Sequence, residues 1–255
     1  MADSTDTTSV ARGSVAGEAP EPAFPVARAQ PAAPAAAELI GLAHRLGNRW
    51  VLRGITLRVE AGQVVAVVGA NGSGKTTLLR VLATALTPTR GIGRVFGLDL
   101  VRDAGRVREL VGMLGHATGL YDDLNVSENL AFSLRMCGLT PSRAAIDRAL
   151  DAVGMRPRAP ELVRALSSGM RRRVALARLI LRRPRVLLLD EPYNSMDAAG
   201  AQAVDALVRD TVRTGGAVLV VTHDLTRREH RYDGVVALSA GRVADGPALR
   251  PELQR

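Results

Sequence analysis

The sequence predicts an α/β domain with a mostly parallel sheet, an antiparallel β segment before it and a helical insert within it. Three runs, residues 64–68, 186–189 and 217–221, are nearly continuous in valine, leucine and alanine, as in strands buried on both faces of a parallel sheet. Helix-like stretches at 171–181 and 198–213 precede the last two runs. Buried strands that alternate with helices are typical of α/β domains.

The composition divides the chain into one domain and two tails. Residues 1–37 are rich in alanine, proline, serine and threonine and show no apolar period, so we expect a disordered tail there. Residues 38–245 have the size of a single domain, and 246–255 are expected to form a C-terminal tail.

Two further patterns place the antiparallel segment and the insert. Apolar residues alternate at Ile55, Leu57 and Val59 before a turn at residues 61–62, which predicts a hairpin or a short antiparallel sheet. From about residue 100 to 165 the strand signal vanishes and helix-like stretches take over, at 127–136 and 142–153. Asn125 or Ser127 is expected to cap the first of these helices.

Charge and cysteine content limit the class of protein. The single cysteine, Cys137, excludes an internal disulfide and a cysteine-rich zinc site, so a reducing cytosol is expected. No apolar run approaches the roughly 20 residues that span a bilayer, and the first 20 residues do not resemble an export signal. The net charge of +9 favours an anionic partner: a nucleotide, a nucleic acid or an acidic membrane surface.

A phosphate-binding loop follows the first buried strand. Residues 69–76 match the pattern G-x-x-x-x-G-K-[ST] and lead into a helix-like stretch at 77–85, which predicts a P-loop NTPase core. Lys75 is the only lysine of the chain and is expected to contact the β- and γ-phosphates, while the hydroxyl of Thr76 binds Mg²⁺. The candidate nucleotide-binding residues are Gly69, Ala70, Asn71, Gly72, Ser73, Gly74, Lys75, Thr76 and Thr77.

Two other buried strands end in residues that can act on a phosphate. Asp190 and Glu191 follow the strand at 186–189, at the sheet edge where the phosphate loop must also lie. Asp190 is the candidate Mg²⁺ ligand and Glu191 the candidate residue that polarises the attacking water. His223 follows the strand at 217–221 and can hold the geometry of that water.

A fourth motif precedes the helix-like stretch at 171–181. Its small residues would expose backbone N–H groups to an anion at the helix start, although a serine there is also an ordinary N-cap. The motif is Leu166, Ser167, Ser168, Gly169 and Met170, followed by three arginines.

Along the chain the four motifs follow one another as the phosphate loop at 69–76, the serine-containing motif at 166–170, the acidic strand end at 190–191 and His223. Motifs in this chain order resemble the ATP-binding subunit of an ABC transporter over essentially all of residues 38–245. The resemblance implies ATP and Mg²⁺ as ligands, ATP hydrolysis coupled to transport, and a head-to-tail homodimer. In that dimer Ser167 and Gly169 of one subunit would cover the γ-phosphate held by the other. It also implies that residues 194–197 couple the two sites. The helical insert would dock an integral membrane permease, which places the subunit peripherally on the cytoplasmic face of the cell membrane.

Four positions depart from the family pattern. Leu46 stands where the family has the aromatic residue that stacks on adenine, and Trp50 is a substitute or a packing residue. The fourth motif, residues 166–170, corresponds to the family's signature motif, in which Ser168 and Met170 replace a glycine and a glutamine. His116 stands where the family has a metal-contacting glutamine and is therefore a further candidate metal ligand.

The segment Leu114-Gly115-His116, followed by residues 124–130, is similar to the haem-exporter ATPases of cytochrome c maturation, and drug-export subunits share the signature and its arginines. Nucleic-acid-linked relatives carry tandem ATPase domains or a long coiled coil, for which this chain has no room, so no nucleic-acid partner is expected. Lys75, Glu191 and His223 argue against a non-hydrolysing scaffold.

Overall fold

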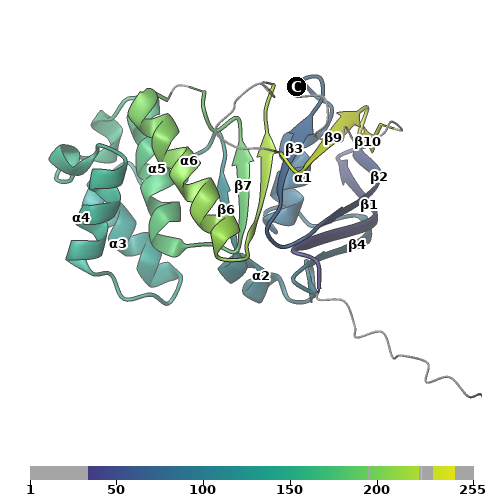
Figure 1. Ribbon diagram of the computed structural model, residues 1–255, viewed down its shortest axis with the longest axis horizontal. Coiled ribbons are helices and arrows are strands. Elements are labelled where there is room, and N and C mark those ends of the chain that lie inside the picture. Colours follow the sequence, from purple (N-terminus) through teal and green to yellow (C-terminus); the bar gives the residue numbers. More distant parts are fainter. Residues whose placement is uncertain (1–33, 195, 224, 226–231, 245–255) are drawn as a thin grey trace, which may run out of the picture. The chain divides into compact units, whose positions relative to one another are not determined.

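A computed structural model describes residues 34–194, 196–223, 225 and 232–244. Its central sheet has six strands in the order β10-β9-β3-β8-β7-β6, in which neighbours from β9 to β6 are parallel and only the β10–β9 pair is antiparallel. A second sheet, in the order β2-β1-β4-β5, is antiparallel. Figure 1 shows helices α3 to α6 beside the parallel sheet and the antiparallel sheet at the other end. The predicted α/β class is confirmed.

The elements have the following bounds. The strands are β1 Ala37–Leu46, β2 Arg49–Val59, β3 Val64–Val68, β4 Arg90–Val95, β5 Leu98–Asp99, β6 Val111–Leu114, β7 Val186–Asp190, β8 Ala217–Val221, β9 Gly234–Ser239 and β10 Arg242–Val243. The helices are α1 Lys75–Leu82, α2 Ala104–Leu110, α3 Val126–Met136, α4 Arg143–Ala152, α5 Ser168–Arg182 and α6 Ala198–Arg213, with short 3₁₀ turns at Arg156–Arg158 and Val163–Ala165.

The parallel sheet separates two hydrophobic cores, because alternate residues of a strand point to opposite faces. Leu187 and Leu189 pack with α3 to α6 in one core. Val186 and Leu188 pack in the other core with α1 and the antiparallel sheet. The strands are therefore buried on both faces, as their continuous apolar sequence predicts.

The antiparallel sheet begins earlier than expected. Ala36 and Ala37, assigned to the tail from composition, are fully buried, and Ala37 pairs with β2 and β4. Small apolar residues fit a close strand contact as well as they fit a flexible tail, so composition does not separate the two cases. The turn at residues 61–62 does not form a hairpin, since it joins β2 to β3 in the other sheet. Residues 1–33 and 246–255 lie outside the described residues.

The expected helical insert contains a strand. β6 pairs in parallel with β7 and so belongs to the central sheet, with α2 before it and α3 and α4 after it. Gly112 interrupts the apolar run of β6, and a Cβ there would lie 2.7 Å from side-chain atoms of Leu179 and Pro184. The close approach to α5 thus requires the glycine that hides the strand in the sequence. Within the described ranges, no helix has the length and apolarity needed to cross a bilayer.

Asn125 is the cap of α3. Its side chain accepts a hydrogen bond of 2.8 Å from the backbone N–H of Glu128, and the Glu128 carboxylate accepts one of 2.9 Å from the backbone N–H of Asn125. This reciprocal pair is a capping box and fixes the start of the helical part. Of the two caps expected from the sequence, the structure has Asn125.

Candidate functional site

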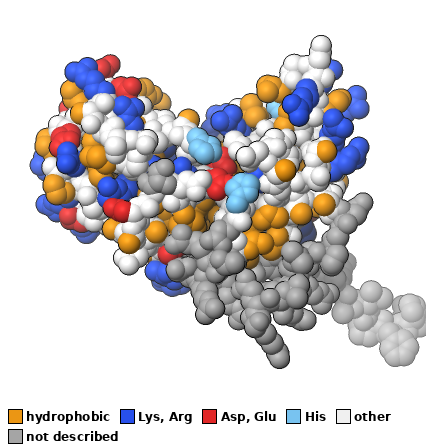
Figure 2. All heavy atoms as spheres, turned by 90° about the horizontal axis from the view of Figure 1, so that it is seen from above, with side chains coloured by type: hydrophobic (Ala, Val, Ile, Leu, Met, Phe, Trp, Pro, Cys, Tyr) orange, Lys and Arg blue, Asp and Glu red, His pale blue; other side chains and the backbone are white. Residues whose placement is uncertain are grey.

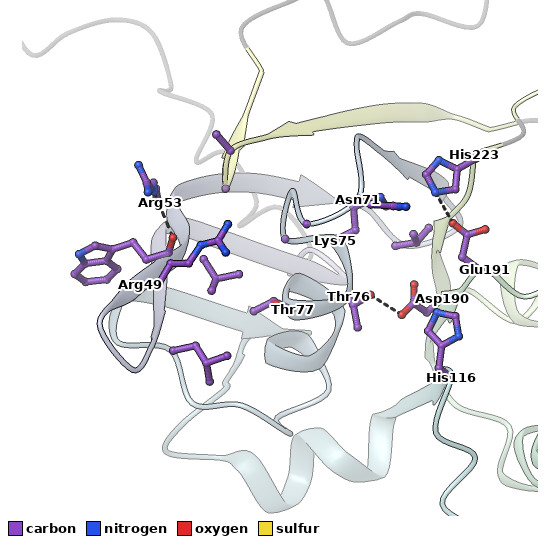
Figure 3. Close-up of a pocket in the computed structure, with 18 residues that line it drawn as sticks. Arg49, Arg53, Asn71, Lys75, Thr76, Thr77, His116, Asp190, Glu191 and His223 are labelled. Carbon is purple, nitrogen blue, oxygen red and sulfur yellow. Dashed lines mark hydrogen bonds and ion pairs between the residues drawn. The ribbon is translucent and has the colours of Figure 1, made fainter.

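A cavity of about 400 Å³ opens at the carboxyl ends of β3, β7 and β8. Figure 2 shows histidine and acidic side chains gathered in the hollow between two lobes of the surface, and Figure 3 shows the lining from within. Ligands of open parallel sheets bind outside the carboxyl ends of the strands. The lining residues are Leu46, Arg49, Trp50, Val51, Arg53, Asn71, Gly72, Gly74, Lys75, Thr76, Thr77, His116, Asp190, Glu191, Val221, His223, Ala240 and Gly241.

The phosphate loop connects β3 to α1 in a conformation that only glycine allows at two points. Gly69 has φ 145°, and a Cβ there would lie 2.1 Å from the carbonyl oxygen of Leu238. Gly74 has φ 108° and is the N-cap of α1. The ammonium of Lys75, which is 7% exposed, donates to the carbonyl oxygens of Gly69 at 2.7 Å and Ala70 at 3.1 Å. The sole lysine is therefore held within the loop that precedes it.

The loop and the end of β7 present oxygen atoms to one another. The hydroxyl of Thr76 donates a hydrogen bond of 2.8 Å to the buried carboxylate of Asp190 (Figure 3). Hydroxyl and carboxylate oxygens are the ligands that Mg²⁺ prefers. The buried hydroxyl of Ser73 has no hydrogen-bond partner within the described part of the chain. An anion in the loop would supply an acceptor for it, so the residues present fit a magnesium nucleotide.

Glu191 follows Asp190 with a left-handed backbone. Its φ is 51°, a conformation that costs a non-glycine residue about 1–3 kcal/mol and that clusters at functional sites. Nε2 of His223 lies 2.9 Å from Oε1 of Glu191, and the amide of Asn194 donates to Oε2 at 3.4 Å. Figure 3 shows His223 and Glu191 facing one another at the edge of the cavity. The two candidate catalytic residues are thus in contact.

Arg172 on α5 contacts the backbone of the same turn. The sequence does not predict this contact. It is 7% exposed, and its Nη2 donates to the carbonyl oxygens of Asp190, at 2.6 Å, and Glu191. Burial lowers the pKa of the Arg172 guanidinium, while the carboxylates of Asp190 and Glu191 oppose that shift. The sequence gives only a run of three arginines, in which nothing marks the middle one as buried.

His116 lines the cavity beyond the end of β6, and Figure 3 shows it beside Asp190. Its side chain is exposed, so it faces the cavity and is not a core residue. Among the described residues, no three acidic, histidine or cysteine side chains gather as a metal site by themselves. The candidate metal ligands Thr76, Asp190 and His116 nevertheless line one cavity.

At the far end of the cavity, Trp50 is the one tryptophan, tyrosine or phenylalanine among the described lining residues. Leu46 is 67% exposed at the rim, and Trp50 packs under the guanidinium of Arg90, whose carbon lies 5.4 Å from the ring centroid. Arg49 and Arg53 line this end and were also not foreseen (Figure 3). The sequence carried no signal for them beyond their charge.

The signature residues lie elsewhere. Ser167 is the N-cap of α5 and accepts a hydrogen bond of 3.3 Å from the backbone N–H of Met170. Ser167 and Ser168 are exposed, Leu166 is buried, and none of residues 166–170 lines the cavity. Of the loop at 194–197, Asp197 caps α6 and contacts Arg173, whereas Ser195 lies outside the described residues.

Comparison with known proteins identifies the family. Residues 52–194 match the family described as ABC transporter. The daunorubicin resistance ATP-binding protein DrrA3 of Streptomyces coeruleorubidus is 39% identical over 211 residues, which are 82% of this chain and 67% of that protein. The cytochrome c biogenesis ATP-binding export protein CcmA of Bordetella bronchiseptica is 40% identical over 192 residues, which are 75% of this chain and 84% of that protein.

Solved structures agree with the sequence relatives. The ATP-binding subunit of an ABC transporter has a TM-score of 0.76 at 26% identity and covers 84% of this chain and 90% of its own. An ATP-binding cassette was solved as a dimer in a post-hydrolysis state with ADP and Pi. It has a TM-score of 0.72 at 25% identity, and the match covers 84% of this chain and 99% of the cassette. The chain therefore belongs to the ABC transporter family and is one of its ATP-binding subunits, which are ATPases.

Proposed function

We propose that this chain is the ATP-hydrolysing motor subunit of an ABC exporter and that the cavity described above is its nucleotide site. The observation that carries the proposal is the convergence of three strand ends on one cavity, which brings Lys75, Asp190, Glu191 and His223 together. These residues come from three separate motifs of the sequence.

The phosphate loop would hold the triphosphate. Backbone N–H groups of residues 70–76 and the N-terminus of α1 favour negative charge at this point. The ammonium of Lys75 now donates to two loop carbonyls and can turn one of its three protons toward the β- and γ-phosphates. A planar guanidinium has no such freedom, which explains why an arginine-rich chain keeps one lysine here.

Thr76 and Asp190 would hold Mg²⁺ through the hydroxyl and the carboxylate that now contact one another. His116 is a further candidate ligand, although its nitrogen suits Mg²⁺ less well than oxygen does. When bound, the ion would neutralise charge on the phosphates.

Glu191 and His223 would prepare the water. A carboxylate oxygen of Glu191 would accept a proton from the water while the water oxygen attacks the γ-phosphorus. The bond between the γ-phosphorus and the oxygen that bridges to the β-phosphate breaks, which gives ADP and phosphate. His223, at 2.9 Å from Glu191, would keep this carboxylate and the water in place.

The signature would complete the site of a second copy. Because residues 166–170 lie outside the cavity of their own chain, a head-to-tail homodimer is the arrangement that lets Ser167 and Gly169 meet a γ-phosphate. We propose that this homodimer binds an integral membrane permease on the cytoplasmic face of the cell membrane, without a nucleic-acid partner.

The proposed transporter is the haem exporter complex of c-type cytochrome biogenesis. The segment Leu114-Gly115-His116 supports this subtype, and the alignment with CcmA covers 84% of that protein against 67% of DrrA3. The second candidate is a drug or other small-molecule exporter, which the 39% identity to DrrA3 favours.

Phosphate release by the full-length chain tests the ATPase, with the variant Glu191→Gln as control. We expect hydrolysis that rises per subunit with protein concentration, and a loss of about 100-fold or more in kcat for the variant with ATP still bound. Undiminished hydrolysis in Glu191→Gln would refute its role. Salt-sensitive DNA binding at nanomolar strength would favour a nucleic-acid function instead.

Deletion of the gene in its host separates the two cargoes. Loss of covalently bound haem in c-type cytochromes, restored by the wild-type chain and not by Glu191→Gln, would support haem export. Normal cytochromes together with increased drug sensitivity would support the second candidate.

A further inference from the structure

The guanidinium of Arg172 is buried directly beneath the turn that carries the candidate catalytic carboxylate. It lies near the start of α5, and its Nη2 donates to the carbonyl oxygens of two consecutive residues, Asp190 and Glu191. Its Nε has no hydrogen-bond partner among the described residues. A buried cation that keeps an unsatisfied nitrogen is costly, so its contacts with the turn must compensate.

The turn itself is strained at the residue that Arg172 contacts. Glu191 has φ 51°, and its backbone N–H donates to the carbonyl oxygen of Val221 at 3.0 Å. Its carbonyl oxygen accepts from Arg172 and also, at 3.2 Å, from the backbone N–H of Asn194. A glutamate with a left-handed backbone persists only where its surroundings hold it. These contacts hold both the backbone N–H and the carbonyl oxygen of Glu191.

The two neighbouring arginines do not share this role. Arg171 contacts the carboxylate of Asp122 and carbonyl oxygens of residues 164 and 166, and Arg173 contacts Asp197. In the part of the chain that the structure describes, only the middle arginine of the run has a contact with the end of β7. The geometry therefore separates three residues that the sequence presents as equivalent.

We propose that Arg172 is a positioning residue of the ATPase reaction, which holds the backbone of Asp190 and Glu191 so that the Glu191 carboxylate faces His223 and the cavity. This inference rests on the proposed function of Glu191. Arg172 itself touches no substrate, since it is covered by the turn and does not line the cavity. Arg172 acts on the position and orientation of the Glu191 carboxylate. A small misplacement of a reacting group can lower a rate by about 100-fold.

Arg182 provides a matched control on the same helix. Its Nη2 also donates to two carbonyl oxygens, of Arg108 at 2.7 Å and Val111 at 3.4 Å, but it lies at the far end of α5 and does not line the cavity. Loss of this guanidinium removes the same kind of contact without altering the turn at Glu191.

The experiment measures kcat, KM and ATP affinity for the full-length wild type, Arg172→Gln, Arg172→Lys and Arg182→Gln. We expect Arg172→Gln to lower kcat by about 10- to 100-fold with KM and ATP affinity within about twofold of wild type. Arg172→Lys should recover part of the loss because an ammonium still donates to carbonyls. Arg182→Gln should stay near wild type. An equal kcat in Arg172→Gln and Arg182→Gln, or a loss confined to KM, would overturn the role.

Two further measurements keep a merely structural role apart from positioning. In the Glu191→Gln background, Arg172→Gln should lower the residual rate no further, since both changes act through one carboxylate; an independent, multiplied loss would contradict the inference. Amide hydrogen exchange should rise at residues 190–194 in Arg172→Gln and not in Arg182→Gln, and unchanged exchange there in Arg172→Gln would overturn the inference without any assay of activity. Absence of hydrolysis in the wild type would count against the proposed function, whereas wild-type hydrolysis with an unaffected Arg172→Gln would refute the positioning role alone.

Discussion

The hydroxyl of Thr76, at the start of α1, donates a hydrogen bond of 2.8 Å to the carboxylate of Asp190 at the end of β7. The two residues are 114 positions apart in the sequence. Their contact joins the phosphate loop to the acidic strand and marks the place where a divalent cation would meet both.

Replacing Thr76 by valine keeps the shape of the side chain and removes its hydroxyl. The buried carboxylate of Asp190 then loses its donor, which should lower the free energy of unfolding by about 1–3 kcal/mol. The concentration of Mg²⁺ needed for half-maximal phosphate release should also rise. Thr76→Ser retains the hydroxyl and should behave as wild type; an unchanged Mg²⁺ dependence in Thr76→Val would contradict the assignment.

Complementation between two inactive variants tests the composite site. Lys75→Ala damages the phosphate loop, and Gly169→Asp places a negative charge where a γ-phosphate of the other copy should lie. In a head-to-tail dimer a mixture of the two rebuilds one intact site, so it should release phosphate although neither variant does so alone.

The matched control mixes Lys75→Ala with Glu191→Gln. Each of these changes damages the cavity of the chain that carries it, so both cavities of a mixed dimer are defective. No intact site can form, and the mixture should stay inactive. Equal activity of the two mixtures would argue against sites shared between copies.

Asn125→Ala should destabilise the helical part of the domain. The change removes the capping box of α3, for which the expected loss is about 1 kcal/mol in the free energy of unfolding, measured by urea denaturation. Ser127→Ala is the comparison, because no side-chain cap of α3 is made by Ser127. A larger loss in Ser127→Ala would reverse the assignment of the cap.

Asp99 gives a pH-dependent contribution to stability. Hydrogen bonds from the backbone N–H groups of Arg102 and Val101 lower the pKa of its carboxyl below the usual 3.8. A lowered pKa stabilises the fold above the usual value, and this contribution disappears as the pH falls through the folded-state value. Asp99→Asn should therefore be less stable than wild type at pH 7, and the difference should shrink in acid; a difference that is independent of pH would exclude this origin.

The sequence predicts best the elements whose pattern is continuous. Strands β3 and β8 have the expected bounds, and so does α6, because nothing interrupts their apolar period. β6 was missed because Gly112, which α5 requires, breaks a strand of four residues. The short strands β4, β5, β9 and β10 owe their form to pairing with distant neighbours and carry little local signal.

The candidate site likewise contains residues that the sequence predicts and one that it does not. Its chemistry-bearing residues could be foreseen because Lys75, Asp190, Glu191 and His223 follow strands that end at one sheet edge. Arg172 could not, since its role depends on burial under a left-handed turn. The sequence pattern does not predict this turn. Arg172 therefore differs from Arg171 and Arg173 only in the folded structure, where it contacts the turn.

The single lysine of the chain lines the cavity proposed to bind nucleotide, with 7% of its surface exposed. Apart from the terminal α-amino group, the chain thus offers acylating and arylating reagents one primary amine, and that amine lies in the cavity at the carboxyl ends of β3, β7 and β8. If nucleotide binds there as proposed, it should shield Lys75 from these reagents, and the labelling stoichiometry at Lys75, measured by peptide mass spectrometry, would report occupancy of the cavity without an engineered tag.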